Sequence, residues 1–165
     1  MDLEEPMKFI NGEHDHQRCM ADAMGNAERV CQQQKQRFTH LRRRVFELIW
    51  QQHKPIGAYD VLEQLQKDGR AAPPTVYRAL DFLLELGLVH RIASLNAYVG
   101  CVHPDRQHEG QFLICKECRA FAELDSDSIT RMIDEKAQIN GFEVHQHTIE
   151  IMGLCPKCQA EKEKS

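Results

Sequence analysis

The sequence predicts an α+β protein built from two small domains. Helical spacing of apolar residues dominates the first hundred residues, whereas short strand patterns and paired cysteines dominate the remainder. All seven cysteines lie outside residues 37–100, and five of them follow residue 100, so the chemistry of the chain changes near that point. We therefore predict an N-terminal domain over 1–97, with 1–19 flexible or irregular, a hinge at 98–102 and a metal-binding domain over 103–165.

Four helices are expected in the first domain, because apolar residues recur at helical spacing in each of them. Thr39 can cap the second helix with its hydroxyl group, and Gly69 ends the third. Pro73 and Pro74 suit the first turn of the fourth helix, which Gly87 stops. The predicted helices span residues 20–35, 41–52, 58–67 and 73–86.

A β-hairpin is expected after the fourth helix, with strands at 88–92 and 97–101 around a short turn. This order of helices and hairpin is that of a winged helix-turn-helix, whose last helix reads DNA. The apolar stripe of that helix leaves Thr75, Tyr77 and Arg78 on another face near its N-terminal end. Arginine can pair with O6 and N7 of guanine, so this face is a candidate for DNA recognition. The alternative is an ordinary solvated helix surface.

The charge distribution points the same way. Residues 37–100 carry a net charge of +3, whereas residues 1–36 and 101–165 carry −3 and −4. A basic middle beside an acidic C-terminal part suits a nucleic-acid reader joined to another function, although +3 is also within ordinary fluctuation. We find no apolar run long enough to span a membrane and no secretory signal, so we expect a cytoplasmic protein without disulfides and without a membrane partner.

The second domain is expected to be a small α/β unit. Ser126 can cap its helix and Gly141 can end it. The predicted strands lie at 111–114, 120–124 and 142–152. A unit of this size cannot bury a large core by itself, so it is a candidate for dimerisation and for stabilisation by metal.

Two CxxC pairs carry the clearest local signal in the chain. Thirty-six residues separate the first pair, Cys115 and Cys118, from the second, Cys155 and Cys158. Each turn can offer two thiolates to one ion, and two such turns make a tetrahedral four-cysteine zinc site. The alternatives are a redox motif and chance. A redox CxxC usually stands alone at a helix N-terminus, whereas both pairs here adjoin predicted strands.

A second set of possible ligands combines nitrogen, sulfur and oxygen. It lies on the wing, at the hinge and in the early strands of the second domain. A mixed site should bind zinc more reversibly than four thiolates, as a sensor requires. The alternative for each histidine is an exposed or hydrogen-bonded side chain. The set consists of His90, Cys101, His108 and Glu123.

Other histidines are weaker metal candidates. His103 could compete with its neighbours as a ligand beside the hinge, and His145 and His147 fall on the predicted last strand as a possible auxiliary site. The segment His14-Asp15-His16-x2-Cys19 also has metal-like composition, although terminal tracts of this kind are often solvent-exposed tails.

An enzyme is the main alternative of a different class, with a zinc centre and Glu123 as general base. Catalytic zinc keeps an open position beside three protein ligands, whereas four candidates are present here. The sequence has no HExxH, GxSxG or phosphate-binding glycine loop, so we expect no enzymatic activity. A zinc buffer without DNA binding is a further alternative.

Three segments resemble the ferric uptake regulator superfamily, and the similarity extends over about residues 20–160. The fourth helix and the following Val89-His90 resemble the zinc uptake branch in particular. Arg42, which closes the second segment, is counted among the DNA-contact candidates on this resemblance. The segments are Pro73-Pro74-Thr75-Val76-Tyr77-Arg78-Ala79-Leu80-Asp81-Phe82-Leu83, Arg37-Phe38-Thr39-His40-Leu41-Arg42 and Tyr59-Asp60-Val61-Leu62.

The resemblance implies a homodimeric repressor of zinc uptake genes with two Zn²⁺ ions per chain. It assigns structural zinc to the four paired cysteines and regulatory zinc to His90, Cys101, His108 and Glu123. Regulatory zinc then sets two winged helices at the spacing of a palindromic operator, which binds one dimer or two. The alternative is a regulator of this superfamily that responds to iron, manganese or peroxide. The iron and peroxide branches carry an HHDH-like run just before the first CxxC, where this chain has residues 108–114. Phe112 in that stretch cannot supply a metal ligand, and a thiolate at Cys101 favours zinc.

Overall fold

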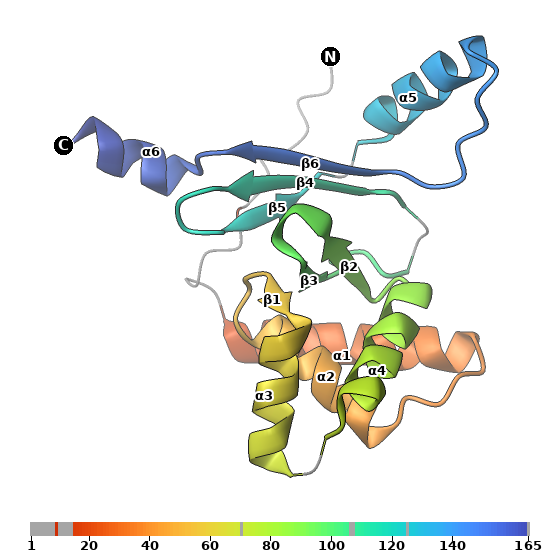
Figure 1. Cartoon of the computed structure of the whole chain (residues 1–165), viewed down its shortest axis with the longest axis vertical. Helices are drawn as coiled ribbons and strands as arrows, with labels where there is room; N and C mark the ends of the chain where they lie inside the picture. Colours follow the sequence, from red (N-terminus) through yellow and green to blue (C-terminus); the bar gives the residue numbers. More distant parts are fainter. Residues whose placement is uncertain (1–8, 10–14, 70, 106–107, 125, 165) are drawn as a thin grey trace. The chain divides into compact units, whose positions relative to one another are not determined.

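The computed structural model describes residue 9 and residues 15–69, 71–105, 108–124 and 126–164. The chain divides into two compact units, one formed by residues 10–107 and the other by residues 1–9 and 108–165. Figure 1 labels their helices and strands. The predicted α+β class is confirmed, because the first unit is mainly helical and the second is built on a small sheet.

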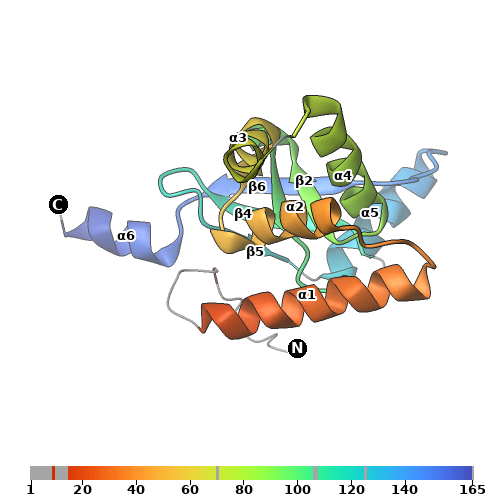
Figure 2. The same cartoon turned by 90° about the horizontal axis from the view of Figure 1, so that it is seen from below.

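The described residues of the 10–107 unit form four α-helices, with α2 at their centre. Helix α2 contacts α1, α3 and α4, and Figure 2 shows α1 running alongside α2. Asp15 caps α1 by accepting from the backbone N–H of Arg18, and Thr39 caps α2 by accepting from that of Arg42. The helices are α1 (His16–Gln33), α2 (His40–Gln51), α3 (Ala58–Asp68) and α4 (Pro73–Glu85).

A three-stranded sheet forms the wing of this unit. Strands β2 (Val89–Ile92) and β3 (Ala97–Gly100) pair in antiparallel fashion, and the short β1 (Ile56–Gly57) pairs with the other edge of β3. A single turn of 3₁₀-helix, η1 (Ala93–Leu95), links β2 to β3, and Asn96 ends it with a left-handed backbone. Four helices followed by this hairpin confirm the predicted winged helix-turn-helix.

Close packing ties the end of the wing to α2. A Cβ atom added at Gly100 would lie 2.2 Å from Cε2 of Trp50, far inside van der Waals contact. Trp50 belongs to the same core as Val45, Leu80 and Leu83, which are completely buried. Only glycine therefore fits at this position next to Cys101.

The second unit is built on the sheet β5-β4-β6. Strand β4 (Gly110–Cys115) pairs antiparallel with β5 (Phe121–Glu123) and parallel with β6 (Thr148–Gly153). The chain crosses from β5 to β6 through α5 (Asp127–Ile139), and α6 (Pro156–Glu163) follows β6. Helices α5 and α6 lie at opposite ends of β6 (Figure 1).

Large apolar side chains remain exposed on this unit. No residue of α5 is buried, and Met132 and Ile139 on that helix are 63% and 77% exposed. Phe142 after the helix and Ile151 and Met152 on β6 are also exposed. Apolar surface of this kind marks a contact site, since single soluble domains usually cover it.

Four details differ from the sequence-based expectations. Helix α1 begins at His16, not at residue 20, because Asp15 caps it. The predicted strand 142–152 is wrong in its first half: β4 offers no paired residue before Thr148, so residues 142–147 are irregular and His145 and His147 precede the strand. The prediction also missed β1 and α6, which are too short or too polar to show periodicity.

Within the described part of the chain, no helix has the length and apolar character needed to cross a membrane.

Candidate metal centres and nucleic-acid interface

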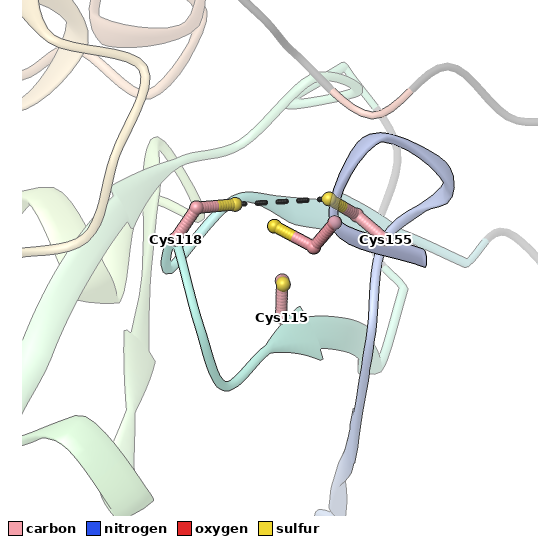
Figure 3. Close-up of side chains that lie close together, drawn as sticks. Cys115, Cys118 and Cys155 are labelled. Atoms are coloured by element: carbon pink, nitrogen blue, oxygen red, sulfur yellow. Dashed lines mark hydrogen bonds between the residues drawn. The ribbon is translucent and has the colours of Figure 1, made fainter. Parts of the chain in front are cut away.

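Four cysteine sulfurs converge in the second unit. Cys115 ends β4, Cys118 lies in the turn that follows, and Cys155 and Cys158 flank the start of α6. Their ligand atoms all lie within 4.8 Å of one another. Figure 3 shows the side chains of Cys115, Cys118 and Cys155 turned toward a common centre.

The spacing of these sulfurs suits zinc. The Sγ atoms of Cys118 and Cys155 are 3.7 Å apart (Figure 3). A tetrahedron with Zn–S bonds of about 2.3 Å has edges of about 3.8 Å. All seven cysteines are free thiols, so the four carry ligand chemistry and not a disulfide. The residues therefore fit a tetrathiolate zinc ion.

Backbone hydrogen bonds bring the two CxxC turns together. The parallel register of β4 and β6 sets Cys115 opposite Gly153, and the backbone N–H of Lys116 donates to the carbonyl of Gly153 at 3.0 Å. The first turn closes with the N–H of Arg119 donating to the carbonyl of Cys115, and Arg119 takes a left-handed backbone there.

The pKa values of Cys115 and Cys158 are shifted in opposite directions. Burial alone would raise the pKa of Cys115, but N–H groups of Cys118, Cys155 and Glu117 donate to its sulfur, and its pKa falls to about 6. Burial, followed by hydrogen bonds with the other cysteines and the negative charge at Cys115, raises the pKa of Cys158 to about 12. A bound cation would offset the repulsion that four thiolates would have in so small a space.

One pair of the predicted regulatory ligands lies on the second unit. Nε2 of His108 and Oε1 of Glu123 are 2.6 Å apart, with 13% and 4% of their side chains exposed. The antiparallel pairing of Phe112 with Glu123 fixes the carboxylate beside β4. Both groups are thus held together at the edge of the sheet.

The other pair lies on the winged-helix unit. His90 pairs with Val99 across the β2–β3 ladder, and the N–H of Cys101 donates to the carbonyl of Leu88 at 3.0 Å. Cys101 is 2% exposed, and its sulfur lies within 4.8 Å of a ring nitrogen of His90. The four predicted ligands therefore fall into two pairs, one on each unit.

The auxiliary metal candidates are placed differently. His103 and His145 are exposed, and neither they nor His147 belongs to a group of three possible ligands among the residues described. The N–H of His147 donates to a carboxylate oxygen of Glu109 at 3.1 Å. Both ring nitrogens of His147 are buried and make no hydrogen bond within the described structure.

Helix α4 presents the predicted DNA-contact face to solvent. Thr75, Tyr77 and Arg78 are all exposed, and 53% of the surface of Tyr77 is accessible to solvent. The opposite face is buried. Arg42 is anchored beside this helix: its guanidinium carbon lies 3.4 Å from the centroid of the Phe82 ring, and its Nη1 donates to the carbonyl of Arg37.

Comparison with known proteins identifies the family. The sequence model of the Ferric uptake regulator family matches residues 33–152 of this chain. The chain belongs to the ferric uptake regulator family. The matched segment runs from the end of α1 into the last residues of β6, so it includes α2 to α4, the wing, the two pairs of predicted regulatory ligands and the first CxxC turn.

Among members of this family, the chain is more similar to zinc regulators than to the ferric regulators compared. It is 39% identical to the Zinc uptake regulation protein of Escherichia coli (strain K12), over 83% of this chain and 81% of that protein. It is 23% identical to the Ferric uptake regulation protein of Staphylococcus epidermidis, over 81% of this chain and 94% of that protein. The predicted resemblance to the zinc uptake branch is confirmed.

Solved structures agree with this placement. A zinc uptake regulator complexed with zinc and DNA is 37% identical, covers 93% of this chain and 100% of that chain, and superposes with a TM-score of 0.81. The crystal structure of holo XcZur is 40% identical, covers 84% of this chain and 98% of that chain, and has a TM-score of 0.80.

Sequence reasoning missed two residues that shape the sites of this ferric uptake regulator family protein. Phe82 supplies the ring beneath Arg42, and Gly100 admits Trp50 beside Cys101. Phe82 lies next to the predicted apolar stripe of α4, so its burial could have been anticipated. Nothing in the sequence pattern links Gly100 to Trp50, which is distant along the chain.

Proposed function

We propose that this protein is a zinc-responsive DNA-binding repressor of zinc uptake genes. The observation that carries the proposal is its similarity, over 93% of its length, to a zinc uptake regulator complexed with zinc and DNA. The exposed face of α4 and two kinds of metal-ligand groups in one chain support it. Activity of this protein would therefore lie in binding and release of DNA, not in catalysis.

The tetracysteine site would hold a structural Zn²⁺ ion. Its four ligands come from one end of the sheet, where the parallel strands β4 and β6 both finish, and from the start of α6, all within the second unit. Three of the four cysteines are buried, which suits a closed site with no place for substrate. Zinc there would supply stability that a unit with a small core lacks.

The second Zn²⁺ ion would be regulatory and would bind His90, Cys101, His108 and Glu123. Each pair is already assembled within its own unit, so one ion that takes both pairs would couple the units. One thiolate, two imidazoles and one carboxylate suit zinc better than iron, because the sulfur is a soft ligand. His147, with its buried ring nitrogens, is the better placed of the auxiliary candidates.

A homodimer would bring two winged helices to one operator. The exposed apolar residues of α5 and β6 supply a surface for self-association, and a closed twofold dimer matches a palindromic site. One dimer or two dimers would bind each operator. The second unit, which contains α5 and β6, would thus be the dimerisation domain. The winged helix at 1–97 would be the DNA-binding domain, and 98–102 would be the hinge.

DNA contacts would come from the N-terminal half of α4. Arg78 would read a base edge, while Thr75 and Tyr77 would contact base or phosphate oxygens. Arg42, stacked on Phe82, has a guanidinium fixed in position beside the helix and would contact the backbone. These contacts place the reading groups on a rigid element.

The test is fluorescence anisotropy of a palindromic AT-rich duplex with purified protein, stepped through buffered free zinc, iron(II) and manganese(II). We expect specific binding that requires zinc. Cys101→Ser should remain a folded dimer that no longer binds DNA at the same free zinc, and His103→Gln, an exposed neighbour, should bind normally. Binding driven by iron or manganese, or independent of metal, would contradict the proposal.

A further inference from the structure

Two histidines outside the sites above face each other in the winged-helix unit. His16 lies in the first turn of α1, and His53 lies just after α2. Nδ1 of His16 is 2.8 Å from Nε2 of His53, and the rings meet edge to face with centroids 4.8 Å apart. The pair therefore joins the start of α1 to the end of α2.

Both rings are held in place by their surroundings. His53 is 9% exposed, and its ring packs edge to face with Trp50 at a centroid distance of 6.2 Å. Its backbone is left-handed, with φ of 46°, which is uncommon for a residue other than glycine. Asp15 caps the turn that carries His16. Such pre-positioning lowers the entropy that a ligand must overcome.

We propose that His16 and His53 bind a divalent transition-metal ion at a site separate from the tetracysteine and regulatory sites. Imidazole nitrogens suit Zn²⁺, Ni²⁺ and Cu²⁺. Two tetrahedral Zn–N bonds of about 2.0–2.1 Å need nitrogens about 3.3 Å apart, so the rings must separate by roughly half an ångström. The ion would then replace the N–H···N contact between the two rings.

The proton balance of this exchange is simple. A neutral imidazole carries one proton, and the nitrogen without it can bind metal. In the metal-free pair, one facing nitrogen carries the proton and the other accepts it. When the metal binds, that proton moves to the other nitrogen of its own ring. The neutral pair thus binds the ion without net loss of protons.

The remaining coordination positions would be filled by water. Among the residues described, the pair belongs to no group of three or more close His, Cys, Asp or Glu ligand atoms. Cys19, one turn after His16, and Asp15 instead line a neighbouring cavity together with Trp50 and Cys101. Two protein ligands predict weak, exchangeable binding, which would fasten the first turn of α1 to α2.

The experiment counts metal ions on the full-length protein. Zn²⁺ and Ni²⁺ are titrated by calorimetry at neutral pH into protein whose tetracysteine site is loaded, in the Cys101→Ser background. We expect one weak equivalent in this background, and its loss in both His16→Gln and His53→Asn. Asparagine tolerates the left-handed backbone of residue 53, so that variant should fold. His40→Gln, at an exposed histidine that starts α2, is the matched control and should retain the equivalent.

Thermal unfolding supplies a second readout. Added Ni²⁺ should raise the Tm of the Cys101→Ser protein, because the ion binds only the folded pair. It should not raise that of His16→Gln by the same amount. A Cys101→Ser protein that binds no such equivalent, or an equivalent that survives in both histidine variants, would overturn the proposal. The first of these results would leave the pair as a structural contact between α1 and the end of α2. Neither result depends on DNA binding, so the proposed repressor function is tested separately.

Discussion

Replacing Gly100 with alanine should disrupt the joint between the wing and the helical core. The added methyl carbon would lie 2.2 Å from Cε2, 2.3 Å from Nε1 and 2.6 Å from Cζ2 of Trp50. Normal carbon–carbon contact is about 3.5–4.0 Å, so one partner must move by more than an ångström. Both partners are held by their neighbours: Gly100 pairs with Val89 across the β2–β3 ladder, and Trp50 is 92% buried in the main core.

Overpacking of this kind destabilises cores by about 1–3 kcal/mol, occasionally more. The rigid partners on both sides predict the upper end of that range for Gly100→Ala. For a unit of this size, each kcal/mol lowers Tm by roughly 4–8 °C. Because Cys101 follows directly, the same change should also weaken zinc-dependent DNA binding.

The assay is thermal and urea unfolding followed by tryptophan fluorescence, since Trp50 is the only tryptophan in the chain. Gly25→Ala is the matched control: Gly25 lies inside α1 with nothing within 4 Å of an added Cβ, and alanine should stabilise the helix by about 0.5–1 kcal/mol. The clash explanation also requires that Gly100→Ala cost less in a Trp50→Leu background, followed there by circular dichroism. Equal stability of Gly100→Ala and wild type would refute the reasoning.

Further predictions concern the other sites. Cys118→Ser should lose the tightly bound zinc and unfold the second unit, measured by metal analysis and circular dichroism; a stable dimeric variant would contradict a structural role. Arg78→Ala should weaken operator binding by about 1–3 kcal/mol, or roughly 5- to 150-fold, with relaxed specificity at one base; a uniform loss over all sequences would indicate a phosphate contact. Met132→Asp should convert the dimer to a folded monomer in sedimentation, because its side chain is 63% exposed on α5; unchanged dimers would place the interface elsewhere. Burial raises the pKa of Cys31 and of Tyr98 above their ordinary values of 9.0 and 10.0, so the unfolded chain loses these protons first. Stability of the winged-helix unit should therefore hold below about pH 9 and fall above it, as urea titrations at rising pH would show.

Helices α2 to α5 could be predicted because their sequences contain apolar residues at helical spacing and end signals. Thr39 caps α2 as expected, and Pro73 and Pro74 open α4 with the buried stripe on the expected side. These signals are local, since a cap or an apolar stripe acts within a few turns. Helix α1 begins four residues earlier than predicted because Asp15 caps its first turn.

Strand limits were harder to predict because they depend on a partner. The segment from Phe142 has strand-like composition, yet β6 begins only at Thr148, opposite the first residue of β4. Phe142 is instead an exposed side chain, 67% accessible, on the proposed dimer surface. In a sequence, apolar residues that contact a second chain cannot be told apart from apolar residues of a buried strand.

The metal sites also depend partly on local sequence and partly on long-range strand pairing. Each CxxC turn is visible in the sequence, but the pairing of the two turns depends on the parallel β4–β6 register. The contact of His108 with Glu123 likewise depends on the β4–β5 ladder. The His16–His53 pair is formed by helix packing, so the sequence could not predict it. The metal-like composition around His16 was the only indication.

The distribution of ligands over the two units predicts an order of metal loss. All four cysteines of the proposed tetrathiolate lie in one unit, so zinc there would bind a site that folding of that unit completes. The proposed regulatory ion needs one pair from each unit, and part of its binding free energy must go into restraining their relative motion. The free energy spent on restraining the two units lowers the apparent zinc affinity of the regulatory site. A chelator should therefore remove regulatory zinc first and leave a folded dimer that no longer binds DNA. Regulatory zinc could then dissociate and rebind while zinc at the tetrathiolate site keeps the dimer folded.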